Sequence, residues 1–266
     1  VGANGHSSST GRAYIFYNDG VIPNATTGAD VIITGETAGD TFGSALMSGD
    51  WNADGKTDLV IGAPLYSTHT GRAYLFYADG TNDFGTVSCS GTPSACLAAN
   101  ADVAFTGIAS YRFGASFAAG DLDGNGRVDL LISTFSYDTY AKTVYLYYND
   151  GTYNTTAATA DVIFSGSGAS QFGSAVTTGD FNTDGRIDLA VSDNENSVEK
   201  VYLFYSDGTN NYGTATCSGT PAACSAADAD TIITNVSNTD FGAAFATGDF
   251  NVDGRTDLVV GAPSNT

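Results

Sequence analysis

Four nine-residue segments of this chain repeat one pattern of oxygen-bearing side chains: DWNADGKTD at 50–58, DLDGNGRVD at 121–129, DFNTDGRID at 180–188 and DFNVDGRTD at 249–257. In each segment positions 1, 3, 5 and 9 hold three Asp and one Asn, and position 6 is Gly. Calcium takes roughly six to eight hard oxygen ligands in a flexible shell, and alternate side chains of a tight loop can supply them. Gly permits the sharp turn that a Cβ would obstruct. The pattern predicts a calcium site in each segment, and therefore about four calcium ions.

We call these segments cage loops. The predicted side-chain ligands are Asp50, Asn52, Asp54 and Asp58; Asp121, Asp123, Asn125 and Asp129; Asp180, Asn182, Asp184 and Asp188; and Asp249, Asn251, Asp253 and Asp257. The residue at position 7 supplies a backbone carbonyl, from Lys56, Arg127, Arg186 and Arg255. An Asp/Asn/Gly turn without an ion is the alternative, and four filled copies disfavour it. Because protein oxygens fill the shell, a bound ion is expected to be structural rather than catalytic.

The cage loops differ from EF-hands, which need a bidentate acid at position 12 and flanking helices. Position 12 is apolar here: Ile61, Ile132, Val191 and Val260. These residues lie in short β-branched runs, which are typical of buried strands. The chain is therefore expected to leave each cage as a strand.

A longer repeat surrounds the loops. A Phe-Gly pair precedes each cage, at 42–43, 113–114, 172–173 and 241–242, and Gly-Ala-Pro follows two of them, at 62–64 and 261–263. An aromatic run comes next, at 12–17, 72–77, 143–148 and 200–205, and then an apolar run after an Asp, at 30–33, 102–105, 161–164 and 230–233. Four short strands per repeat and 33 glycines predict an all-β chain without long helices.

Together these motifs resemble the FG-GAP repeat, which builds the β-propeller of integrin α subunits and of secreted bacterial proteins of the VCBS type. The resemblance covers essentially the whole chain and implies four-stranded propeller blades, with calcium in each cage loop. Two repeats depart from it, since Ser133-Thr134-Phe135 and Ser192-Asp193-Asn194 replace Gly-Ala-Pro.

We expect one β-propeller array over residues 1–266, with four blade-equivalents. It divides into a half-blade of outer strands at 1–41, blades at 42–112, 113–171 and 172–240, and a half-blade of inner strands at 241–266. The complementary halves could close a four-bladed ring, complete blades of neighbouring chains, or belong to a longer propeller. Blades alternate in length, and each long one carries an insertion with two cysteines.

Charge and cysteine content restrict the compartment and the partners. Nine basic and 29 acidic residues give a net charge of −20, which argues against nucleic-acid binding. No apolar run is long enough for membrane insertion. The matching cysteine pairs predict local disulfides, Cys89–Cys96 and Cys217–Cys224, and with calcium they favour an extracellular or cell-surface location. Glycosylation motifs occur at Asn24, Asn154 and Asn235.

Catalytic patterns are missing from the sequence. His6 and His69 are the two histidines, and no nucleophile motif, phosphate-binding loop or zinc cluster is present. We therefore expect no enzymatic activity, but a calcium-stabilised extracellular scaffold for adhesion or self-assembly, such as a subunit of a surface fibre. Its expected partners are a second copy, joined head-to-tail through the half-blades, or a cell-surface protein or glycan. The alternatives are a glycan-binding lectin and a non-catalytic propeller domain of a larger secreted enzyme.

Overall fold

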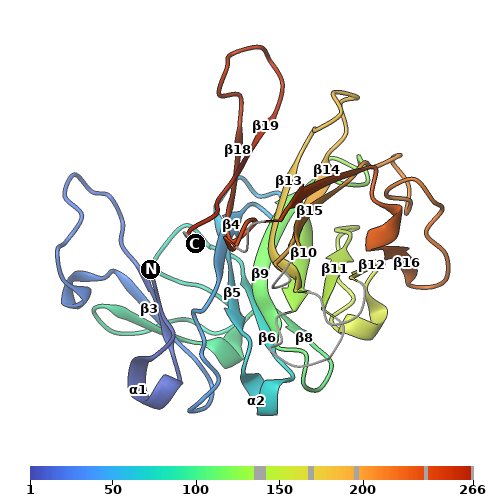
Figure 1. The fold of residues 1–266 in the computed structure, drawn as a ribbon. Coiled ribbons are helices and arrows are strands. Elements are labelled where there is room, and N and C mark those ends of the chain that lie inside the picture. Colours follow the sequence, from blue (N-terminus) through green and yellow to red (C-terminus); the bar gives the residue numbers. More distant parts are fainter. Residues whose placement is uncertain (135–141, 167–170, 195–197, 237–238, 265–266) are drawn as a thin grey trace. The chain divides into compact units, whose positions relative to one another are not determined.

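The computed structural model describes residues 1–134, 142–166, 171–194, 198–236 and 239–264 (Figure 1). Phe135, part of one departure from Gly-Ala-Pro, and Ser237, of the Asn235 glycosylation motif, lie outside these residues. The chain forms two compact units, Val1–Ala115 and Ser116–Thr266. Each unit is described by itself.

Unit 1 contains two four-stranded sheets. The first has the order β1-β2-β3-β7, and the second β4-β5-β6-β8. Their strands are β1 (Gly2–Ala3), β2 (Arg12–Ile15), β3 (Val31–Thr34) and β7 (Ser94–Leu97), and β4 (Leu46–Gly49), β5 (Asp58–Ala63), β6 (Arg72–Phe76) and β8 (Val103–Thr106). Two one-turn helices, α1 (His6–Ser9) and α2 (Tyr66–His69), and two 3-10 turns, η1 (Thr26–Gly28) and η2 (Ala98–Asn100), connect them.

Unit 2 repeats this organisation. A five-stranded sheet has the order β16-β12-β11-β10-β9, a four-stranded sheet the order β13-β14-β15-β17, and β18 pairs with β19. The strands are β9 (Phe113–Gly120), which crosses the unit boundary, β10 (Asp129–Thr134), β11 (Thr143–Tyr147), β12 (Val162–Ser165), β13 (Phe172–Gly179), β14 (Asp188–Asp193), β15 (Glu199–Phe204), β16 (Ala222–Ser225), β17 (Thr231–Asn235), β18 (Phe245–Gly248) and β19 (Asp257–Val260). Two 3-10 turns, η3 (Ala157–Thr159) and η4 (Ala226–Asp228), precede β12 and β17.

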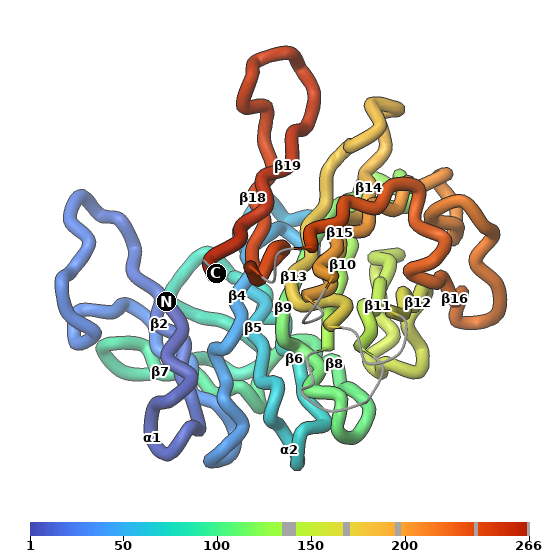
Figure 2. The backbone as a smooth tube through the Cα atoms, viewed as in Figure 1, coloured from blue at the N-terminus to red at the C-terminus, as the bar shows by residue number. Residues whose placement is uncertain are grey.

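Each cage loop connects two antiparallel strands. The pairs are β4–β5, β9–β10, β13–β14 and β18–β19. Figure 2 follows the chain through the last pair, where loop 249–257 joins β18 to β19. The all-β prediction, with sheets of four strands of the propeller-blade type, is confirmed. The divisions between blades and the closure of a ring stay predictions.

The cysteine insertions add strands that the sequence analysis missed. β7 pairs in parallel with β3, from Val31↔Ser94 to Thr34↔Leu97. β16 pairs in the same way with β12, from Val162↔Ala222 to Ser165↔Ser225. Each insertion thus covers the outer strand of a neighbouring sheet. A covered strand has no open row of backbone groups, so the insertion removes an edge that could pair wrongly.

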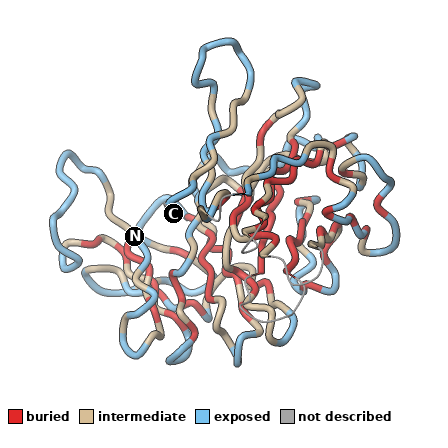
Figure 3. The backbone as a smooth tube through the Cα atoms, in the orientation of Figure 1, coloured by how far each residue is buried: buried red, intermediate tan, exposed pale blue. Residues whose placement is uncertain are grey.

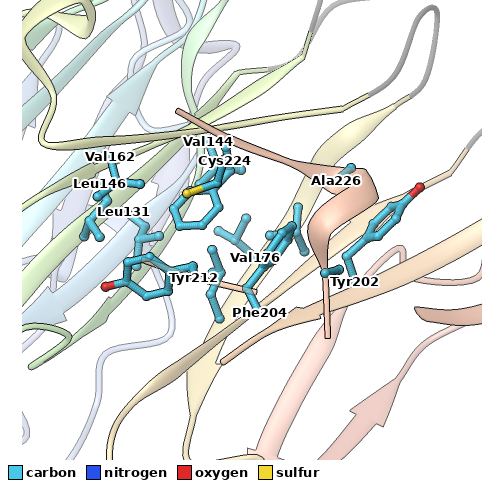
Figure 4. Close-up of a cluster of buried hydrophobic side chains, with 14 of the residues drawn as sticks. Leu131, Val144, Leu146, Val162, Val176, Tyr202, Phe204, Tyr212, Cys224 and Ala226 are labelled. Atoms are coloured by element: carbon cyan, nitrogen blue, oxygen red, sulfur yellow. The ribbon is translucent and has the colours of Figure 1, made fainter. Parts of the chain in front are cut away.

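The largest core lies in unit 2. Its side chains come from strands β9 to β16 and from the turns beside them, and Figure 4 shows a group of them gathered between the sheets, with Phe204 and Tyr212 among them. Phe164 contacts both rings edge-on, with centroids 5.2 Å apart. Every residue of β10 and β14 is buried, as expected for strands covered on both faces. Along unit 2 the buried residues follow the strands, while the cage loops are mostly exposed (Figure 3).

Candidate divalent-cation sites

The cage loop at 50–58 shows how side-chain oxygens organise the turn. Asp50 accepts the backbone N–H groups of Asp54 and Gly55 through its two oxygens, at 3.1 and 2.9 Å. Asn52 Oδ1 accepts the N–H of Asp54 at 3.0 Å, and Asp54 Oδ1 accepts the N–H of Lys56 at 2.9 Å. Gly55 has φ +82°, in the left-handed region, as the sharp-turn prediction requires. The oxygens of positions 1, 3 and 5 therefore face the inside of the loop.

The loops at 180–188 and 249–257 repeat these bonds. Asp180 accepts the N–H groups of Asp184 and Gly185 at 3.1 and 3.0 Å. Asp249 accepts those of Asp253 and Gly254 at 2.9 and 2.8 Å. The same donor arrangement thus forms three times from similar sequences.

The loop at 121–129 differs because Asp is at position 3 and Asn at position 5. Ligand oxygens of Asp121, Asp123 and Asp129 lie within 4.8 Å of one another, close enough for the three to hold one metal ion. Asp121 Oδ1 is buried and has no hydrogen-bond partner among the described residues. A buried carboxylate oxygen without a partner is costly unless a cation neutralises it. The residues present therefore fit a bound divalent cation.

The aspartate at position 9 links its cage to the turn after the third strand. Its Oδ2 accepts an N–H of the cage, and its Oδ1 accepts a distant N–H about twenty positions later in the sequence. The distant bonds are Ala78 N–H to Asp58 at 2.9 Å, Asn149 N–H to Asp129 at 2.7 Å and Ser206 N–H to Asp188 at 2.9 Å. All three aspartates are buried. Anything that orders the cage also orders this turn.

Burial perturbs the acidity of these aspartates. Loss of hydration raises the pKa of Asp129 to about 6, although the N–H groups of Asn149 and Leu122 oppose the shift. The same cause raises the pKa of Asp58 and of Asp188. A buried carboxylate that favours its protonated form without a cation gains from a nearby positive charge.

A second aspartate accepts another backbone N–H at the same turn. The sequence did not predict this aspartate as a site residue. The aspartate that precedes the fourth strand of each repeat accepts the N–H of a tyrosine one or two residues after the end of the third strand. These bonds are Tyr17 to Asp30, Tyr77 to Asp102, Tyr148 to Asp161 and Tyr205 to Asp230, at 2.7, 2.8, 2.8 and 2.7 Å. The sequence contains a signal for it, because an Asp precedes the fourth strand of each repeat. That signal does not identify the N–H group that the Asp accepts. Its role is structural.

The basic residue at position 7 lies over the Asp-Gly turn. A Cβ at Gly208 would be 2.9 Å from Arg186 Nε, and one at Gly80 would be 3.1 Å from Lys56 Cδ. Lys56 also pairs with Asp54 at 2.8 Å, and the hydrogen bond lowers the pKa of that carboxyl. Glycine in this turn is therefore needed for φ, +81° at Gly208, and a larger residue would also have to displace the flexible basic side chain. The predicted carbonyl ligation by the position-7 residues stays a prediction.

Comparison with protein families finds the FG-GAP repeat at residues 42–76 and 241–266, and an FG-GAP-like repeat at 121–191. The matched ranges contain all four cage loops. This chain carries FG-GAP repeats. FG-GAP propellers of the integrin kind generally bind divalent cations, which agrees with the cage geometry.

Several known proteins are similar to the chain over part of its length. Mouse phosphatidylinositol-glycan-specific phospholipase D is 33% identical over 146 residues, which are 50% of this chain and 16% of that protein. Integrin alpha-4 of Xenopus laevis is 28% identical over 151 residues, 55% of this chain and 13% of the integrin. Human integrin alpha-IIb is 34% identical over 112 residues, 38% of this chain and 9% of the integrin. The chain thus spans a small part of the length of these relatives.

The two predicted disulfides of this FG-GAP chain are confirmed. Cys89 is bonded to Cys96 and Cys217 to Cys224. The second cysteine of each bond, Cys96 or Cys224, lies within the parallel strand β7 or β16, and the bond ties that strand to the segment just before it. With the relatives, the disulfides indicate an extracellular or secreted protein.

The remaining predicted residues have different surroundings. Asn24 and Asn154 are exposed, whereas Asn235 Nδ2 donates to Glu199 Oε2 at 2.8 Å and to Thr239 Oγ1 at 2.7 Å. Glycosylation itself stays a prediction. Among the described residues no helix has the length and apolar character needed to cross a membrane.

Proposed function

We propose that this chain is an extracellular, calcium-binding β-propeller scaffold for adhesion or self-assembly. The observation that carries the proposal is the unpartnered, buried Asp121 Oδ1 in a cage loop whose donor pattern occurs four times. Calcium is favoured over magnesium because the donors are carboxylate and amide oxygens on flexible loops, without a strict octahedron. A bound divalent ion would neutralise two of the three carboxylate charges in each cage and fix the turns joined to them.

If calcium binds the folded chain and not the unfolded chain, then calcium binding must stabilise the fold. We expect about four ions per chain by isothermal titration calorimetry, and a lower melting temperature in excess chelator. Asp184→Ala should remove one ion and weaken the sheet β13-β14-β15-β17 most, and Asp228→Ala, outside every cage, is the matched control. An unchanged melting curve in chelator would refute a structural role for calcium.

The scaffold role rests on similarity to integrin alpha chains and on the absence of catalytic patterns from the sequence. Its partner is a cell-surface protein, a glycan, or a second copy joined through the half-blades. Sedimentation of the chain with and without calcium distinguishes these, because self-assembly requires species larger than a monomer. A monomer at every concentration would eliminate the self-assembly version.

A second candidate follows from the similarity to phosphatidylinositol-glycan-specific phospholipase D of mouse and rat. In that case the chain is a non-catalytic propeller domain of a larger secreted enzyme. The complete reading frame tests it, since an adjoining catalytic domain must be encoded in the same chain. Assays of the present chain for phosphodiesterase activity should be negative under either proposal.

A further inference from the structure

The cage loop at 121–129 contains a chemical feature that the other three lack. Its position 5 is Asn125, directly followed by Gly126, whereas the other cages have Asp at this position. An Asn-Gly pair is prone to deamidation because a glycine amide nitrogen reaches the preceding side chain without hindrance from a Cβ. A candidate metal ligand is therefore also a candidate modification site.

The chemistry needs only water. The Gly126 nitrogen forms a bond to Asn125 Cγ, the Cγ–Nδ2 bond breaks, and ammonia leaves as a five-membered imide forms. Water then opens the imide at one of its two carbonyls. One opening gives aspartate, and the other gives isoaspartate, whose backbone runs through the former side chain. Either product is one mass unit heavier than the original chain, and no oxidant or enzyme is required.

The ordered loop holds both reacting groups away from this reaction. The Gly126 N–H donates to Asp121 Oδ2 at 2.9 Å. Asn125 Nδ2 donates to Asp123 Oδ2 at 2.9 Å and to the Asn149 carbonyl at 3.2 Å, while Asn125 Oδ1 accepts the Arg127 N–H at 2.8 Å. The nucleophile and the leaving amide must therefore leave these partners before the imide can form.

A bound cation would strengthen that restraint, and its loss would weaken it. Three carboxylates share the loop, and their ligand oxygens lie within 4.8 Å of one another. Without a cation they repel one another, and residues 124–127 of the loop, which include Asn125, are exposed to solvent. We infer that deamidation of Asn125 is controlled by occupancy of this cage, so that calcium protects the site and calcium loss opens it. This inference rests on the proposed calcium site.

The two products have opposite consequences for the cage. Aspartate at 125 gives the loop a fourth carboxylate and keeps its length, which favours cation binding. Isoaspartate adds a backbone carbon beside Gly126, whose φ of +84° makes the turn, and so moves the position-7 carbonyl and Asp129 out of register. A chain depleted of calcium would thus permanently lose one site in a fraction of its molecules.

The chain provides its own control in Asn4-Gly5, the other Asn-Gly pair in the sequence. Asn4 is exposed and outside every cage, and its Nδ2 donates to Ser44 Oγ at 3.2 Å. Trypsin releases Asn4 in the peptide 1–12 and Asn125 in the peptide 113–127, so mass spectrometry follows both in one sample. Asp123-Gly124 can isomerise in the second peptide, but without a change in mass.

The experiment incubates the purified chain in mildly alkaline buffer with calcium or with chelator. If only the cation-free loop reacts, calcium at 100 times its Kd should slow the mass gain of peptide 113–127 by roughly 100-fold, while peptide 1–12 keeps its rate. After incubation in chelator, restored calcium should bind to fewer sites than before.

Two results overturn the inference. One is an equal rate of mass gain at Asn125 with calcium and with chelator; the other is equal calcium dependence in both peptides, which would indicate a general effect. Titration of the fresh protein with calcium distinguishes failure of the proposed calcium site from failure of the deamidation inference. Absence of binding refutes the calcium site itself, whereas binding without protection of Asn125 refutes only the deamidation inference.

Discussion

Replacing Asp188 by alanine should separate the two roles of the position-9 aspartate. Asp188 Oδ2 accepts the N–H groups of Phe181 and Asn182 at 2.9 and 3.3 Å, and Oδ1 accepts the Ser206 N–H at 2.9 Å. A buried donor left without a partner costs about 1–3 kcal/mol. The hydrogen bond from Ser206 is buried, and those from Phe181 and Asn182 are partly buried. Removing the buried carboxylate charge of Asp188 offsets some of the stability lost with these bonds. We expect Asp188→Ala to lower the free energy of unfolding by about 2–4 kcal/mol even in chelator.

Asp180→Ala is the matched variant in the same cage. Asp180 accepts two N–H groups that are exposed, so water can replace the carboxylate. In chelator we expect a loss of under about 1 kcal/mol for this variant. In calcium both variants should also lose the stabilisation contributed by one ion.

Thermal unfolding followed by circular dichroism measures the difference, and hydrogen exchange at residues 204–209 locates it. For a unit of this size about 1 kcal/mol corresponds to roughly 2–4 °C, so Asp188→Ala should melt roughly 4–16 °C lower in chelator. Equal melting temperatures for the two variants in chelator would refute the reasoning. The position-9 aspartate would then act through the ion alone.

Three further predictions follow from other contacts. Replacement of Cys217 and Cys224 by serine should lower the free energy of unfolding by about 2–3 kcal/mol, the entropy of closing an eight-residue loop, with lost exchange protection in β16 as the local readout. Burial raises the pKa of Asp161, so its contribution to stability in chelator is present near pH 4 and is lost as pH rises through the folded pKa. Asp161→Asn should therefore flatten the fall of the urea midpoint as the pH rises above about 4, and an unchanged slope would contradict the assignment. On secretion from a glycosylating host, mass spectrometry should find glycans at Asn24 and Asn154 but not at Asn235, because the Asn235 amide is bonded to Glu199 and Thr239.

Features set by neighbouring residues could be predicted from the sequence. The cage turns depend on donors and acceptors within nine positions, and the strands follow directly from the apolar runs beside them. The cysteine pairs were also local, since each disulfide spans a sequence separation of seven. Local chemistry therefore sufficed for the cages, the strands and the disulfides.

Features that depend on distant pairing could not be predicted in the same way. Asp58 and Ala78 are 20 positions apart, and nothing in either residue type identifies the other as its partner. The parallel pairing of β16 with β12 joins segments about 60 residues apart, and the sequence of an insertion does not say which sheet edge it covers. The burial that raises the pKa of Asp129 to about 6 depends on the packing of distant strands, and the residue type does not show it.

Hydrogen bonds join the cage loop to the turn after the third strand, which explains why the loop and the strands around it repeat together. In the sheet β13-β14-β15-β17, Asp188 and Asp230 accept the consecutive N–H groups of Ser206 and Tyr205, and Arg186 lies over Gly208 in the following turn. Three chain segments thus meet at one turn, and one of them is the cage. A cation there need not hold the strands together, because hydrogen bonds already do so. It is better placed to fix the exposed loops at the end of each sheet, and under the proposed scaffold function these loops are the surface open to partners.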